Sequence, residues 1–394
     1  MKKGTDIFSP ARLFIFVWSL AIGLADLKLS RFQLSWSLFS WIMILIAIAA
    51  MLTGMFIVYV INSDKEIPSL AVIRENHVAK ELNNKLLFYI IIFLFSSYII
   101  SFIVTSIVEG YIPFFTFAPD ATRSKWGIFG FGLFIQIVPS ILYFMILYFI
   151  ITQRQKNRKL FIGLLFLLTI STYFLILQRF YIVYCILLTV VFLFYSSNKI
   201  STRNIIIIVT IVLLVIYGIS AVRTSRYLIN IVHYISLMKY SAKYAYFTEP
   251  YMYIVMNLEN FAHAVDKLNV FDYGYNTFDF ILAMTGIKHM IFDYTHIKEF
   301  PFIVTVSYNT YTMFFAYYKD FGILGLFFIP FLLGMVISKF YYKMRMNPSL
   351  NNISLYGVFA FVIIFSFFIP IISWLHFILN LVVIVIVTKQ ISLQ

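Results

Sequence analysis

The chain has 394 residues, of which 62% are hydrophobic and only 12% are charged, and its mean hydropathy is +0.92. Soluble domains are about 45–50% apolar and about 25% charged, so this composition excludes an ordinary soluble domain and indicates an all-α protein that crosses a membrane many times. The net charge of +14 does not indicate nucleic-acid binding, because Lys and Arg concentrate in the cytoplasmic loops of membrane proteins and no soluble basic module is present.

About ten apolar segments, with a total between nine and twelve, are candidate membrane spans. A helix needs about 20 mostly apolar residues to cross the hydrocarbon core. In chain order the candidates lie at 11–25, 35–62, 86–107, 126–152, 159–177, 180–197, 204–221, 318–339, 353–369 and 371–388.

Basic clusters follow alternate candidate spans, for example "QRQKNRK" after the fourth and "NKISTR" after the sixth. Positively charged loops face the cytoplasm. We therefore expect a multi-pass protein of a bacterial cytoplasmic membrane, with both termini cytoplasmic.

With this orientation, the segment 222–317 is one long external loop. Seven predicted spans precede it in residues 1–221 and three follow it in residues 318–394, and we expect all of them to form one membrane domain. Two stretches of the loop, "YLINIVHYISLMKYSAKYAYF" and "YMYIVMNLENFAHAVDKL", have apolar residues at helical spacing, and we expect them to form helices at the outer membrane interface. The loop histidines show no metal-ligand spacing, so we expect solvated surface histidines and no metal site.

Three arginines on the external side are candidate anion ligands. Arg179 lies between two spans that leave almost no loop, and Arg223 and Arg226 open the long loop in "VRTSRY". Guanidinium groups bind phosphate in a bidentate manner. The alternative is that these side chains extend along the helix to reach lipid headgroups.

The stretch "NTYTMFFAYYKDFGILG" covers residues 309–325, where the long loop returns to the membrane. Its Asp-Phe-Gly tripeptide is not a kinase signature, because the chain has no glycine-rich phosphate loop, strand lysine or catalytic-loop aspartate of a kinase. Gly322, Gly325 and Gly334 are expected to allow close helix packing. Asp320 has two interpretations: a catalytic group, or a structural group that pairs with Lys319 or caps the helix start.

The run of Asn-x-Tyr-Thr followed by Tyr-x-Asp-Phe-Gly-x-x-Gly resembles the Wzy-type polymerases of bacterial oligosaccharide repeat units. The likeness extends to "LQRFY", "VRTSRY", "YFTEPY" and "YGYNTFDF", and covers about residues 160–340. It implies a GT-C-like glycosyltransferase with a cavity open to the periplasm or exterior. Such an enzyme moves a growing glycan from undecaprenyl diphosphate onto a new lipid-linked repeat unit in O-antigen (lipopolysaccharide) or capsule biosynthesis.

The resemblance also implies a set of partners and site residues. The lipid bilayer and undecaprenyl-diphosphate-linked oligosaccharides are expected partners, a chain-length regulator and a flippase are further candidates, and no cofactor is expected. Arg179, Arg223 and Arg226 would hold the diphosphate. The acceptor hydroxyl must lose a proton, and the candidate catalytic groups are Glu249, His296 and Asp320. Weaker candidates for binding the glycan are Tyr246, Tyr251, Asn309 and Tyr311.

Other functions stay open from the residues alone. An O-antigen ligase would use the same donor and a different acceptor. A flippase or another transporter would show internal repeats or charges in the middle of spans, and neither is evident. For Glu249 the alternative to catalysis is a carboxylate at the start of a helix that begins near Pro250.

Overall fold

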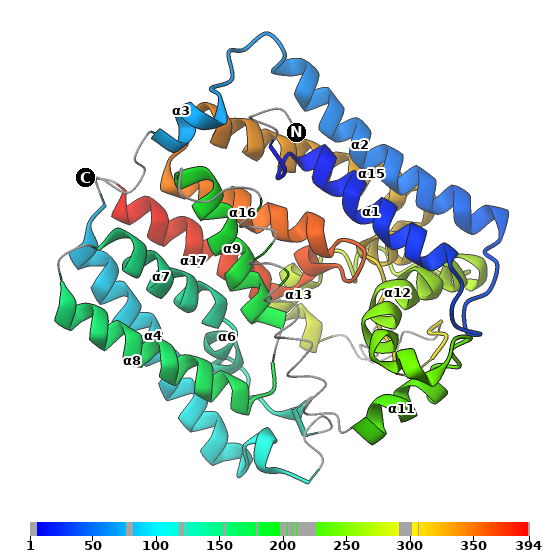
Figure 1. The fold of residues 1–394 in the computed structure, drawn as a ribbon, viewed down its shortest axis with the longest axis horizontal. Helices are drawn as coiled ribbons and strands as arrows, with labels where there is room; N and C mark the ends of the chain where they lie inside the picture. The colour runs from blue at the N-terminus through cyan, green and yellow to red at the C-terminus, as the bar shows by residue number, and fades with distance from the viewer. Residues whose placement is uncertain are drawn as a thin grey trace. The chain divides into compact units, whose positions relative to one another are not determined.

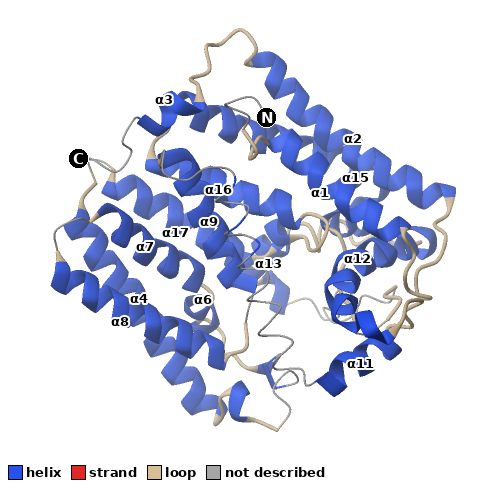
Figure 2. Cartoon of the chain, in the orientation of Figure 1, coloured by secondary structure: helices blue, strands red, loops and turns tan. Residues whose placement is uncertain are grey.

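The structure is a computed structural model, and its described residues form helices joined by loops (Figure 2). Among these residues there is one isolated β-bridge, between Ser30 and Met238. Every structural statement below concerns only the residues that the structure describes. These are residues 6–75, 82–117, 122–123, 125–152, 155–178, 180–197, 203, 207, 210, 226–290, 302–305 and 307–392, with the side chains of residues 75, 226–228 and 289 excepted.

Five of the described helical segments are long and apolar enough to cross a membrane, and three shorter helices are also apolar. These eight helices match eight of the ten spans predicted from hydropathy. The predicted span at 11–25 corresponds to α1 (Pro10–Asp26), which is not one of the eight, and most of 204–221 lies outside the described residues. An all-helical protein embedded in a membrane is therefore supported, whereas the number of spans stays a prediction. The long segments are Leu38–Ile61, Asn84–Phe115, Phe131–Ile151, Lys156–Leu175 and Met313–Met346.

The helices form two compact units. The first comprises Met1–Ile67, Thr202–Tyr342 and Val362–Leu375. Its helix α12 packs against α1, α2 and α11 (Figure 1). The elements of this unit are α1 (Pro10–Asp26), α2 (Leu38–Ile61), α11 (Arg226–Ile235), η2 (Ala242–Phe247), α12 (Thr248–Lys267), α13 (Asp279–Thr285), η3 (Ile287–His289), most of α15 (Met313–Met346) and η4 (Ile371–Ser373).

The second unit comprises Pro68–Ser201, Lys343–Phe361 and His376–Gln394. Its centre is α7, which packs against α4, α8 and α9 and buries nearly all of its side chains. The elements are α3 (Leu70–Glu75), α4 (Asn84–Glu109), η1 (Pro113–Phe115), α6 (Phe131–Ile135), α7 (Val138–Ile151), α8 (Lys156–Leu175), α9 (Phe180–Ser196), most of α16 (Leu350–Phe365) and α17 (Leu375–Ile391).

Helix α12 follows from its local sequence. Glu249 lies in the first turn and Lys267 in the last, where each charge suits the helix dipole. Pro250 is tolerated because amide groups of the first turn need no partner within the helix. Thirteen of the 20 residues are buried, so this predicted loop helix is a core element of the first unit.

Two glycines let α2 and α15 cross at close range in the first unit, side by side in Figure 1. A Cβ atom on Gly54 would lie 2.0 Å from the carbonyl oxygen of Phe331, and one on Gly334 would lie 2.2 Å from that of Met51. Helices in membranes associate through such small residues, because lipid supplies no hydrophobic drive between them. The predicted packing role of Gly334 is confirmed.

Candidate functional site

A pocket of about 250 Å³ lies within the first unit. Its wall comes from three parts of the chain: the turn before α13, the segment that leads into α15, and the segment after α16. The lining residues are Asn276, Asp279, Asn309, Thr310, Tyr311, Phe315, Ala316, Ile369, Pro370, Ser373 and Trp374.

Helix α12 holds the segment that leads into α15. The amide nitrogen of Asn260 donates to the carbonyl oxygens of Tyr308 and Thr310, at 2.8 Å each, and its amide oxygen accepts from Val304 N at 2.8 Å. Asn257 accepts from the hydroxyl of Thr310. Asn260 is fully buried, and a buried polar group without a partner is costly, so these bonds keep the segment in a defined position beside the pocket.

The turn before α13 is clamped by the Lys-Asp pair of α15. Asp320 Oδ1 accepts from the backbone and side-chain nitrogens of Asn276 at 3.1 and 2.8 Å, and Oδ2 accepts from Thr277 N at 2.5 Å. Lys319 forms an ion pair with Asp272, with 3.0 Å between Nζ and Oδ2. The stretches "YGYNTFDF" and "YKDFG" are therefore bonded to each other, and the clamp presents Asn276 to the pocket.

The third wall is tied to the start of α15 and to α1. The carbonyl oxygen of Ser366 accepts from Met313 N, and its hydroxyl accepts from the Trp18 indole, at 2.8 Å in both cases. The Trp18 ring also stacks on Phe314, with 4.7 Å between the ring centroids. These contacts hold the chain from which Pro370, Ser373 and Trp374 reach the pocket.

The pocket combines amide, hydroxyl and carboxylate groups with aromatic rings. Asp279 contributes the carboxylate, and its Oδ1 atom accepts from Lys288 Nζ at 2.6 Å. Tyr311 stacks on Phe315, with 3.8 Å between the centroids, and burial raises the pKa of its phenol, so this group is a neutral hydrogen-bonding partner at ordinary pH. Aromatic faces beside a few fixed polar groups are typical of binding sites for small polar molecules.

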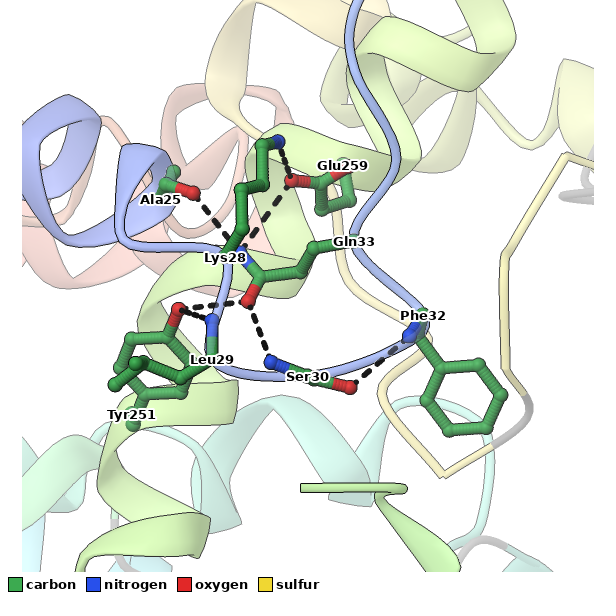
Figure 3. A network of polar contacts seen from close by, with 8 residues as sticks. All are labelled: Ala25, Lys28, Leu29, Ser30, Phe32, Gln33, Tyr251 and Glu259. Carbon is green, nitrogen blue, oxygen red and sulfur yellow. Dashed lines mark hydrogen bonds and ion pairs between the residues drawn. The ribbon is translucent and has the colours of Figure 1, made fainter. Parts of the chain in front are cut away.

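A second polar network in this unit joins the connection between α1 and α2 to α12 (Figure 3). Lys28 Nζ donates to Glu259 Oε1 at 2.6 Å, and the amide nitrogen of Gln33 reaches the same oxygen at 3.4 Å. The hydroxyl of Tyr251 donates to Gln33 Oε1 at 2.6 Å and accepts from Leu29 N at 3.1 Å. None of these residues lines the pocket, so the network secures a connection between helices.

Two of the predicted glycan ligands, Asn309 and Tyr311, line the pocket. Asp320 does not line it, and its side chain is fully buried. Its oxygens accept from Asn276 and Thr277, and the adjacent Lys319 forms an ion pair with Asp272.

The remaining predicted residues that the structure describes lie outside the pocket lining. Glu249 is half-buried in the first turn of α12. Burial raises the pKa of the nearby Tyr308 to about 12, and the charge of Glu249 adds to that shift. Tyr246 is exposed, and the hydroxyl of Tyr251 belongs to the network with Gln33.

The predicted cationic ligands and one predicted base are not placed by the structure. Arg179, Arg223 and His296 lie outside the described residues, and Arg226 begins α11 with its side chain outside the description. A different arginine, Arg123, has a described side chain close to this region. Its guanidinium donates to Leu177 O, two residues before Arg179, at 3.3 Å.

The histidines of the predicted external loop are not all solvated. His233 is buried, with Nδ1 2.9 Å from the Thr248 hydroxyl and Nε2 3.0 Å from the carbonyl oxygen of Tyr240. His263 Nδ1 donates to Phe302 O at 2.8 Å. The expectation of a solvated surface is therefore wrong for His233, because tertiary contacts bury it. Within the described ranges no three His, Cys, Asp or Glu side chains are grouped to hold a metal ion.

Sequence reasoning missed Asn276, Asp279 and Trp374, which line the pocket, and the buried asparagines that position it. One usable signal was the spacing of Asn257, Asn260 and His263, which places three polar side chains along one face of α12. Asp279 lies in the quoted stretch "YGYNTFDF" but was not singled out within it, and no local pattern marks Trp374.

Comparisons of the chain with protein-family models, with curated proteins and with solved structures gave no match.

Proposed function

We propose that this chain is a membrane glycosyltransferase that polymerises undecaprenyl-diphosphate-linked oligosaccharide repeat units at the outer face of a bacterial cytoplasmic membrane. The observation that carries the proposal is the pocket, because it unites two of the stretches through which the sequence resembles Wzy-type polymerases. "NTYT" contributes Asn309, Thr310 and Tyr311, and "YGYNTFDF" contributes Asn276 and Asp279.

The chemistry of the pocket suits a sugar. A pyranose ring presents hydroxyl groups around its edge and C–H groups on its faces, so it is bound by amides and carboxylates at the edge and by aromatic rings at the face. Asn276, Asn309 and Trp374 supply both kinds of contact. At about 250 Å³ the pocket is below the range of about 300–1,000 Å³ for drug-sized ligands, which matches one terminal sugar of a longer glycan.

The reaction needs a donor with a stable leaving group. In a polyprenyl-diphosphate glycan the leaving diphosphate gains negative charge in the transition state, and preorganised cations stabilise that charge. Arg179, Arg223 and Arg226 remain the proposed ligands of the diphosphate. The apolar helices keep the polyprenyl chain and the protein in the same bilayer.

The deciding experiment is deletion of the gene, followed by gel electrophoresis of surface polysaccharide. A polymerase predicts loss of the long-chain ladder and retention of lipid that carries one repeat unit. Complete loss of attached glycan would contradict this proposal and favour a ligase or a flippase. Complementation with the wild-type chain should restore the ladder.

A pocket variant links that phenotype to the site. Trp374→Ala removes an aromatic face, and we expect the KM for lipid-linked repeat units to rise about tenfold, which corresponds to about 1.4 kcal/mol of lost binding. Phe117→Ala is the matched control, because Phe117 is an exposed aromatic residue outside the pocket. Equal kinetics in the two variants would remove Trp374 from the sugar site.

A further inference from the structure

We propose that Asp279 is the general base that takes the proton from the acceptor sugar hydroxyl. This inference rests on the proposed glycosyltransferase function and assigns a residue to one of its steps. Asp279 is the one carboxylate among the residues that line the pocket within the described part of the chain. Its side chain is 15% exposed, so it is held inside the unit and still faces a space that a substrate can enter.

An ion pair holds the carboxylate of Asp279 in place. Lys288 Nζ lies 2.6 Å from Oδ1. The lysine is itself only 14% exposed, so solvent screens the pair less than it would at the surface. The ion pair also fixes the direction of the carboxylate, and general-base catalysis requires such fixed geometry.

The clamp on the preceding turn positions this group. Asp320 binds Asn276 and the backbone nitrogen of Thr277, two residues before Asp279 at the start of α13. Both oxygens of Asp320 accept N–H groups in a fully buried setting. Asp320 is therefore a positioning residue, and Asp279 is the catalytic residue at the pocket surface.

The proposed step balances as a substitution at the anomeric carbon. Asp279 accepts the proton of the acceptor hydroxyl while the hydroxyl oxygen forms a bond to C1 of the donor sugar. The bond between C1 and the phosphate oxygen breaks, and polyprenyl diphosphate leaves with the electron pair. The products are the longer glycan, polyprenyl diphosphate and a protonated Asp279, which returns its proton to solvent.

The test uses the purified full-length protein in detergent with undecaprenyl-diphosphate-linked repeat units. We expect Asp279→Asn to lower kcat about 100-fold, with KM within about threefold of the wild type. Asp64→Asn is the matched control, because Asp64 is exposed and lies outside the pocket.

The outcomes separate this inference from the proposed function. A wild-type protein that makes no polymer overturns the proposed function itself. A polymerising wild type together with an Asp279→Asn variant of equal kcat overturns only the assignment of Asp279. If Asp279→Asn does not fold, Asp279→Glu decides: it keeps the carboxylate but moves it by one methylene, and kcat should fall at least tenfold. An unchanged kcat in Asp279→Glu assigns Asp279 a structural role and overturns the inference.

Discussion

Helix α15 has a kink at Gly322, and the two helical segments on either side of it make different kinds of contact. Residues 313–321 contain Lys319 and Asp320, which clamp the turn before α13, and they contribute Phe315 and Ala316 to the pocket. Residues 323–342 instead pack against α2 through Gly334. Several apolar side chains of this second segment stay exposed at a spacing of four residues: Leu324, Phe328, Leu332 and Val336.

The contrast shows how one long apolar segment combines a wall of the candidate site with a close helix crossing. In the first segment, charged groups are stable because each has a partner, which offsets their desolvation. In the second segment, contact depends on backbone proximity and on the absence of side chains at the crossing. The two segments meet at Gly322, which has a φ of 59° and a ψ of −139°, a conformation that side-chain-bearing residues avoid.

The largest effect is expected where the second segment crosses α2. Gly54→Ala would place a Cβ atom 2.0 Å from Phe331 O, so the helices must separate, and we expect a loss of about 3 kcal/mol in the free energy of unfolding. Thermal unfolding of the purified protein in detergent measures this loss. Gly23→Ala is the control, since a Cβ there would meet nothing within 4 Å. Equal melting temperatures for both variants would refute the close crossing.

An intermediate effect is expected at the clamp of the first segment. Asp320→Asn keeps the shape of the side chain but directs an amide N–H₂ group toward N–H donors, so at least one buried donor loses its partner. We expect a loss of about 2 kcal/mol in stability and a larger fractional loss of polymerising activity, because the turn that carries Asn276 is released. Asp64→Asn, at an exposed site, should change neither. Full activity in Asp320→Asn would show that the clamp does not position the pocket.

The smallest effect is expected at the junction. Gly322→Ala must adopt the positive φ and would place a Cβ atom 2.9 Å from the Phe271 ring, with an expected loss of about 1 kcal/mol. Gly132→Ala, which has open space and no positive φ, is the control and should not be destabilised. A Gly322→Ala protein as stable as the wild type would show that the two segments can join as a regular helix.

Hydropathy was sufficient to locate the apolar helices. Predicted spans at 35–62 and 86–107 correspond to Leu38–Ile61 and Asn84–Glu109, because a long apolar run is a property of consecutive residues. The predicted start at 318 was five residues late for α15, which begins at Met313. Lys319 and Asp320 lower the local hydropathy there. Both charges are buried in the folded protein, where their partners stabilise them.

The site was less accessible to sequence reasoning. Asn309 and Tyr311 were predicted as glycan ligands and line the pocket, whereas Asp320 was predicted as catalytic or capping and binds Asn276 and Thr277. Asp279 lies in "YGYNTFDF", one of the stretches through which the sequence resembles Wzy-type polymerases, but only the fold shows that it lines the pocket. The roles of Arg179, Arg223, Arg226 and His296 stay predictions.

The sequence by itself determined the membrane class of this protein and the places where its apolar helices run, because hydrophobicity and helix length are set by neighbours along the chain. Only the tertiary structure decided which polar residues form a site. Asn276, Tyr311 and Trp374 belong to separate segments, and they meet because Asn260, Asp320 and Ser366 each hold one wall of the pocket through hydrogen bonds. Such bonds depend on positions in space, which no local pattern encodes.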